Sequence, residues 1–94
     1  MYRLTTKKRI AGVDLPVPLV TCESKPTALK RMNAAIRDAE SELNANEAGI
    51  VGGQIEITLE ECAHAIGGKA DMIAHAVIKR PVNSPKVETF KDGL

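Results

Sequence analysis

Two cysteines and two histidines are the residues of this 94-residue chain that could support nucleophilic catalysis or bind a metal ion. A histidine beside a cysteine can activate its thiolate, and both residue types are common zinc ligands. Cys62 and His64 are two positions apart, so on a helix they would point to opposite sides. On a strand they would share a face, but Cys22 and His75 would still have to converge on them. Because the chain also has no glycine-rich phosphate-binding loop and no nucleophile-elbow motif, we predict no enzyme activity, no metal site and no cofactor.

The cysteine count and the hydropathy pattern indicate a cytoplasmic protein. Two cysteines can form at most one disulfide, which is too few for a disulfide scaffold, so we expect reduced thiols. No segment approaches the roughly 18 consecutive apolar residues that a membrane-spanning helix needs. The basic segment 1–9 looks like the start of a signal peptide, but Asp14, Pro16 and Pro18 interrupt the apolar stretch that would have to follow. We therefore expect neither secretion nor membrane binding.

The formal net charge of +1 conceals a strong asymmetry along the chain. Residues 1–37 contain eight Lys and Arg residues and two acids, a net charge of +6, whereas residues 38–94 contain five basic residues and ten acids, a net charge of −5. Such an asymmetry favours charged partners or head-to-tail self-association, although two solvated faces of different charge would also produce it. The sequence thus predicts an acidic face made of Asp38, Glu40, Glu42, Glu47, Glu56, Glu60 and Glu61, and a basic face made of Arg3, Lys7, Arg9, Lys30 and Arg31.

The first part of the chain predicts a β-hairpin. Residues 2–10 alternate between apolar or threonine side chains and mainly basic ones, which is typical of a half-buried strand. Residues 12–14 are suited to a chain reversal, and residues 15–21 alternate again. Pro16 and Pro18 remove two backbone donors from the same side of that second strand, so we expect it at an edge of the sheet.

Residues 26–44 predict one long helix. Apolar residues recur there at spacings of three and four, as Leu29, Met32, Ile36, Ala39 and Leu43. Ser24 can cap the helix, and Pro26 suits an early position whose backbone lacks a partner anyway. Basic residues near the start and acids near the end oppose the helix dipole, as expected if partners set the charge pattern.

The second half of the chain allows two interpretations. Residues 54–59 alternate as a third strand, and Thr58 with Glu61 has the form of a capping box. The favoured interpretation therefore places two short helices within residues 58–80, followed by a tail, 81–94, that is irregular or forms a short strand. The fold is then a single α+β domain over residues 1–94: an N-terminal hairpin packed on one long helix, a third strand and two C-terminal helices. The alternative pairs 54–66 and 70–80 as long strands, giving a four-stranded antiparallel sheet with one long helix.

In the favoured interpretation, residues 58–80 resemble a helix-turn-helix segment. Ala63, Gly67 and Ile73 have the spacing of the small residue, the turn glycine and the buried aliphatic residue in that family. The resemblance implies DNA binding by the second helix and its end, through Lys69, Asp71, His75, Lys79 and Arg80.

The charge pattern, rather than any reactive centre, gives the main functional hypothesis. We expect a non-enzymatic interaction protein whose charged surfaces bind, and inhibit or modulate, a basic nucleic-acid-binding protein or nucleoprotein complex. Small phage and plasmid accessory proteins, including anti-CRISPR-like inhibitors, commonly act in this way. Nucleic acid could contact the basic N-terminal face, and a homodimer is compatible with the charge pattern. However, Tyr2 and Phe90 are the only aromatic residues, too few for a row of base-stacking platforms. The alternative function is a small helix-turn-helix transcriptional regulator.

Overall fold

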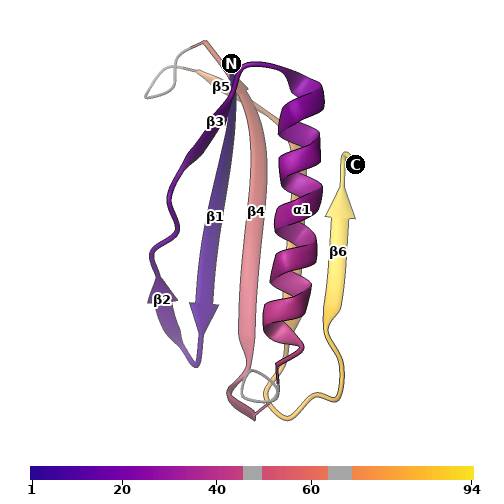
Figure 1. Cartoon of the computed structure of the whole chain (residues 1–94). Coiled ribbons are helices and arrows are strands. Elements are labelled where there is room, and N and C mark those ends of the chain that lie inside the picture. The colour runs from indigo at the N-terminus through magenta and orange to yellow at the C-terminus, as the bar shows by residue number, and fades with distance from the viewer. Residues whose placement is uncertain (46–49, 64–68) are drawn as a thin grey trace.

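The computed structural model describes residues 1–45, 50–63 and 69–94, which form one helical layer on one antiparallel sheet (Figure 1). The strands lie in the order β2-β1-β4-β5-β6, and β3 also pairs with β1. The long helix α1 lies along one face of this sheet, and no described element covers the other face. The predicted α+β class is therefore confirmed. In chain order the elements are β1 (Tyr2–Ile10), β2 (Val13–Leu15), β3 (Val20–Cys22), α1 (Lys25–Leu43), β4 (Gly53–Cys62), β5 (Ala70–Arg80) and β6 (Glu88–Asp92).

The predicted N-terminal hairpin is present, but its second strand is divided in two. The chain turns at Ala11 and Gly12, whose φ values of 55° and 76° are those of the two-residue turn that matches the twist of a hairpin. β2 then pairs with the end of β1, and β3 pairs with its start. Pro16 and Pro18 lie in the stretch between β2 and β3. Because prolines cannot donate to a strand ladder, this side of the sheet remains an edge, as predicted.

The predicted long helix is confirmed as α1. The Ser24 hydroxyl oxygen accepts a hydrogen bond from the backbone N–H of Thr27 at 3.4 Å, and a proline occupies the first turn. The buried stripe differs from the predicted one at a single position, because Ala28 is buried where Leu29 is only partly buried. This stripe packs on the buried residues of the sheet: Leu4, Ile55, Ile57, Leu59, Ala74, Ala76 and Ile78.

The two C-terminal helices predicted within residues 58–80 are wrong, because the described part of this segment is strand. β4 and β5 pair antiparallel over almost their whole length, from Gly53 opposite Arg80 to Cys62 opposite Ala70. Thr58 and Glu61, predicted to cap a helix, both lie within β4. The long-strand alternative correctly predicted this part of the fold, and the tail forms the short strand β6.

The physical reason for this error lies in the alanines of β5. Alanine favours helices intrinsically, but Ala74 and Ala76 are 2% and 0% exposed and lie on the face of the sheet that packs against α1. Small side chains at these positions allow the helix to approach the sheet, so tertiary packing outweighs local propensity. Since the two helices are absent from the described part of residues 58–80, the helix-turn-helix interpretation is not supported. Its turn residue, Gly67, lies outside the described residues.

The C-terminal end of α1 is held by an arginine from β5. The Arg80 guanidinium donates from Nη1 to the carbonyl oxygens of Leu43, at 2.8 Å, and Ala45, at 3.2 Å. Its Nε also donates to the carbonyl oxygen of Ser84, at 3.0 Å. Since the last turn of α1 contains no basic residue of its own, Arg80 supplies the positive charge that favours this end of the helix dipole.

Candidate interaction surfaces

The face of the sheet opposite α1, which we call the open face, is built from the alternate residues of each strand. On β1 it carries the basic residues Arg3, Lys7 and Arg9, because Leu4 on the other side is in the core. On β4 it carries Glu56 and Glu60, because Ile55, Ile57 and Leu59 face the helix. Opposite charges therefore lie side by side on neighbouring strands of this face.

Two cross-strand contacts show this mixing directly. Arg3 Nη2 lies 3.3 Å from Glu60 Oε1, with both side chains partly buried. His75 Nε2, on β5, lies 3.4 Å from Glu56 Oε2. The charge asymmetry between the two halves of the sequence thus does not become a separation into two ends of the described molecule, because β1 and β4 are adjacent.

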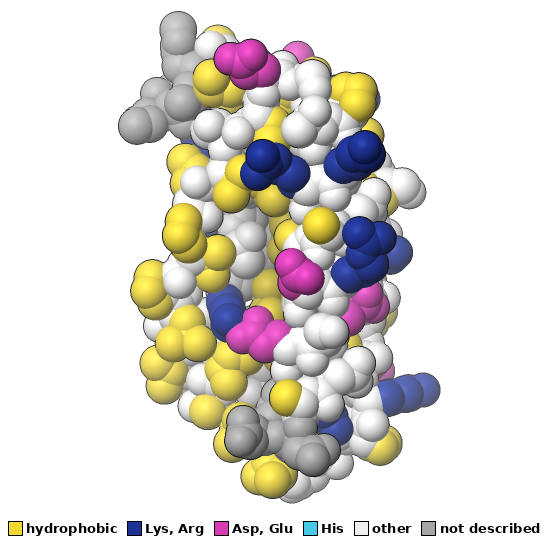
Figure 2. Space-filling view, in the orientation of Figure 1, with side chains coloured by type: hydrophobic (Ala, Val, Ile, Leu, Met, Phe, Trp, Pro, Cys, Tyr) yellow, Lys and Arg dark blue, Asp and Glu magenta, His cyan; other side chains and the backbone are white. Residues whose placement is uncertain are grey.

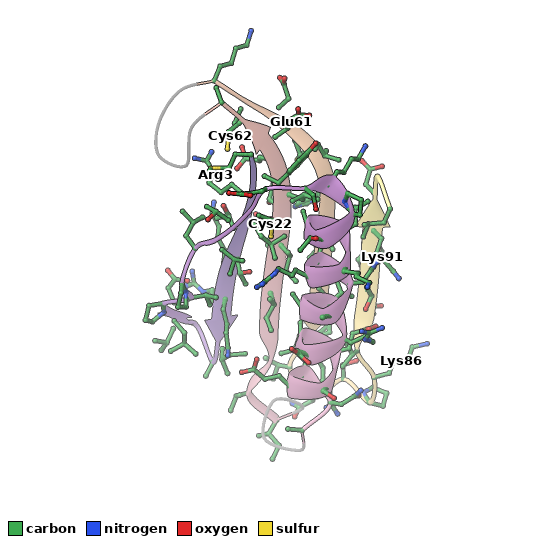
Figure 3. All side chains as sticks on the ribbon, turned by 45° about the horizontal axis from the view of Figure 1, so that its top comes forward. Arg3, Cys22, Glu61, Cys62, Lys86 and Lys91 are labelled. Atoms are coloured by element: carbon green, nitrogen blue, oxygen red, sulfur yellow. The ribbon has the colours of Figure 1, made fainter. Side chains whose placement is uncertain are left out.

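The residues of the predicted acidic face are divided among several parts of the molecule. Glu56 and Glu60 lie on the open face, and Glu61 is exposed near the end of β4 (Figure 3). Asp38, Glu40 and Glu42 lie on α1, in the other layer, and Glu47 lies outside the described residues. Glu40 accepts a hydrogen bond from the Thr89 hydroxyl at 2.8 Å, and this bond links α1 to β6.

The predicted basic face is divided in the same way. Arg3, Lys7 and Arg9 lie on the open face, whereas Lys30 and Arg31 are exposed on α1. The structure therefore brings together three of these five residues.

The five residues that the helix-turn-helix resemblance assigned to DNA binding are not on a recognition helix. Asp71, His75, Lys79 and Arg80 belong to β5, and Lys69 immediately precedes it. His75 and Lys79 are on the open face, and Lys79 Nζ lies 5.1 Å from the centre of the Phe90 ring. Arg80 is used to hold the end of α1.

A groove that the sequence did not indicate runs between α1 and the chain from β2 to β3. It encloses about 180 Å³, with Ile55 and Ile57 at its floor and Ala39 on the helical wall. Asp38 and Glu42 stand along its helical side. Lys8 reaches from β1 to form an ion pair with Glu42. The groove therefore combines a mainly apolar floor with a rim of two carboxylates, one of which is paired with Lys8.

Val17 lies on the other wall of this groove and belongs to an exposed apolar strip. Val13, Leu15, Val17 and Leu19 are 57%, 40%, 36% and 49% exposed. Figure 2 shows hydrophobic side chains gathered over β2 and the segment leading to β3, with the surface hollowed between them and α1. The sequence pattern marked these residues as one side of a strand, and the prolines marked an edge. Together these two signals could have indicated that α1 would leave the strip uncovered. A contiguous exposed apolar strip beside charged residues is a common feature of protein-binding surfaces.

The cysteines and histidines do not form a reactive site in the described residues. Cys22 and Cys62 are both buried free thiols near the end of the sheet where β1 starts (Figure 3). Cys22 on β3 is opposite Tyr2 on β1, and Tyr2 is opposite Glu61, the neighbour of Cys62 on β4. Since β1 lies between β3 and β4, the backbones that carry the two cysteines are two strand spacings, about 10 Å, apart. That separation exceeds the roughly 7 Å limit between Cα atoms for a disulfide.

Metal-binding and membrane-spanning features are also absent from the part of the chain that the structure describes. No group of three or more His, Cys, Asp or Glu side chains in these ranges is placed to hold a metal ion, and His64 lies outside them. No helix in these ranges has both the length and the apolar character needed to cross a bilayer. Comparison with protein-family models, curated proteins and solved structures finds no match for the chain.

Proposed function

We propose that this chain is a non-enzymatic interaction protein that binds a basic nucleic-acid-binding protein, or a complex containing one, through the groove between α1 and the β2–β3 segment. The observation that carries the proposal is a groove with a mainly apolar floor and an acidic rim that is bordered by an exposed apolar strip. A segment that alternates apolar residues with Lys or Arg would meet each of these features with its chemical complement.

The magnitudes explain why both parts of the groove are needed. Complete burial of a Val or Leu side chain contributes about 1.5–3 kcal/mol. The four strip residues are roughly half exposed, so covering them contributes on the order of 4 kcal/mol. Association costs about 4–15 kcal/mol before any interaction is counted. The strip alone is therefore insufficient, and the charges must contribute affinity, selectivity and association rate.

The acidic rim makes a basic partner the favoured one. Asp38 is exposed on α1 beside the groove, while Glu42 is already paired with Lys8. An incoming Lys or Arg can pair with Asp38 at once and can compete with Lys8 for Glu42. Nucleic acid is disfavoured here because its phosphates would face two carboxylates.

The test is capture of a partner by matched charge variants. Three proteins are used as bait in host lysate treated with nuclease: the native chain, the Asp38→Lys variant and the Asp71→Lys variant. The proteins that each bait captures are then identified. Both variants replace an exposed carboxylate by lysine, but Asp71 lies on β5, away from the groove. We expect a basic nucleic-acid-binding protein with the native chain and with Asp71→Lys, and its loss with Asp38→Lys. Equal capture by all three proteins would contradict the proposal, as would capture that disappears with nuclease.

A further inference from the structure

The open face is large enough to serve as an interface. Its strands are spaced about 4.8 Å apart, and the central ones are nine to eleven residues long at about 3.3 Å per residue. The four neighbouring strands β1, β4, β5 and β6 together present an area on the order of 600 Å². Stable interfaces bury about 800 Å² on each partner, so this face is suited to a complex of modest affinity.

The two sides of the open face differ in charge. Lys7 and Arg9 on β1 form what we call its basic margin, and both are exposed. Arg9 Nη1 lies 3.5 Å from Asp14 Oδ1 on the adjoining strand β2, in an exposed ion pair that contributes little, so Arg9 remains open to a partner carboxylate. Glu88 and Asp92 on β6 form its acidic margin, on the same face because Thr89 between them points to Glu40 of α1. The central strands lie between these margins and carry Glu56, opposite Lys7, and Lys79, opposite Glu88.

We propose that a second copy of this chain binds to the open face, with a two-fold axis parallel to the strands and between β4 and β5. This axis places the basic margin of each copy over the acidic margin of the other, so the charge complementarity occurs twice. It also places β4, with Glu56, over β5 of the second copy, with His75 and Lys79. Phe90, 55% exposed at the centre of β6, comes to lie against the β1 side chains of the second copy, where Lys7 can contact its ring.

The edges of the sheet are less suitable for self-association than its face. The β2–β3 edge is interrupted by Pro16 and Pro18, which cannot donate to an added strand. At the other edge, β6 is five residues long and contains Glu88, Lys91 and Asp92. Short strands and charged side chains both discourage edge-to-edge pairing.

Nucleic acid is also a poorer occupant of the open face than a second copy. Each of the two strands that carry its lysine and arginine residues lies next to a strand with carboxylates, and Arg3 is paired with Glu60. Phosphates would therefore meet negative as well as positive side chains. The proposed pairing is independent of the groove, which lies on the helical side of the sheet, so either proposal can fail without the other.

The experiment is sedimentation equilibrium of the full chain and of charge-reversal variants. Lys7→Glu/Arg9→Glu makes both margins acidic, and Glu88→Lys/Asp92→Lys makes both basic. Lys30→Glu/Arg31→Glu changes the charge by the same amount as the first variant but on α1. Circular dichroism and thermal melting establish that each variant is folded before its mass is measured.

We expect the native chain to dimerise with micromolar affinity in about 0.05 M salt and to dissociate at about 0.5 M, where exposed charges are screened within a few ångström. Each margin variant should be monomeric alone, and an equimolar mixture of the two should form a heterodimer. The α1 variant should dimerise like the native chain. A monomeric native chain at 0.5 mM would overturn the proposal. So would dimers of either margin variant alone, a mixture that remains monomeric, or loss of the dimer in the α1 variant.

Discussion

Replacing Arg80 by methionine should destabilise the fold more than the loss of any charged side chain on the open face or on the exposed side of α1. The substitution keeps most of the side-chain volume but removes three hydrogen bonds to backbone carbonyl oxygens, two of them partly buried. Hydrogen bonds to charged groups contribute about 1.5–3 kcal/mol when buried, and exposure reduces this, so we assign about 1 kcal/mol to each partly buried one. The lost positive charge at the end of α1 adds about 0.3–1 kcal/mol.

The expected loss is therefore about 2–3 kcal/mol, a large part of the stability of a domain of this size. For a chain of 60–100 residues, each kcal/mol shifts the melting temperature by roughly 4–8 °C, so Arg80→Met should lower it by about 10–20 °C. The assay is thermal unfolding followed by circular dichroism, with urea unfolding as a second measure of free energy.

Two controls separate the hydrogen bonds from the charge. Arg80→Lys keeps the charge but cannot reproduce the planar set of donors, so it should recover less than half of the loss. Lys79→Met changes the neighbouring residue on the open face, whose contact is with Phe90, and should cost less than about 1 kcal/mol. A melting temperature for Arg80→Met within 2 °C of the native value would refute the role of Arg80 at the end of the helix.

Three further predictions concern the start of α1, the core and the groove. Ser24→Ala removes the side chain that accepts from the Thr27 N–H, so it should lower the unfolding free energy by about 1 kcal/mol, measured from the urea midpoint. An unchanged midpoint would contradict the cap. Ala76→Leu, at a fully buried position facing α1, should cost at least about 1–3 kcal/mol by overpacking, despite the good helix propensity of leucine. A more stable variant would contradict the strand β5. Lys8→Ala removes the internal competitor for Glu42, so it should strengthen binding of the basic partner in titration calorimetry, and weaker binding would count against the groove.

The parts of the fold that were predictable from the sequence are those set by local chemistry. The helix α1 was predicted almost to its ends because Ser24 and the apolar stripe are signals within one element. The edge position of the β2–β3 segment followed from Pro16 and Pro18, which act through their own missing donors. In each case the structure was determined by residues a few positions apart.

The sequence did not decide between helices and strands for residues 58–80, because their structure depends on residues far away. Ala74 and Ala76 fit both a helix and a strand, and the choice was made by pairing with β4 and packing under α1. The candidate surfaces also depend on contacts between residues far apart in the sequence. Arg3 and Glu60 belong to the basic and acidic halves of the sequence, yet strand order places them 3.3 Å apart. The groove depends on how far α1 extends across the sheet, which no local pattern encodes.

Hydrogen–deuterium exchange on the complex with the captured basic protein tests the proposed function most directly. Bound and unbound chains are compared peptide by peptide at the same pH and temperature. The proposal predicts slower exchange on binding in residues 13–20 and in the C-terminal half of α1, around Asp38 and Glu42, with little change at β6. Slower exchange confined to the open-face strands, or none in residues 13–20, would contradict binding through the groove.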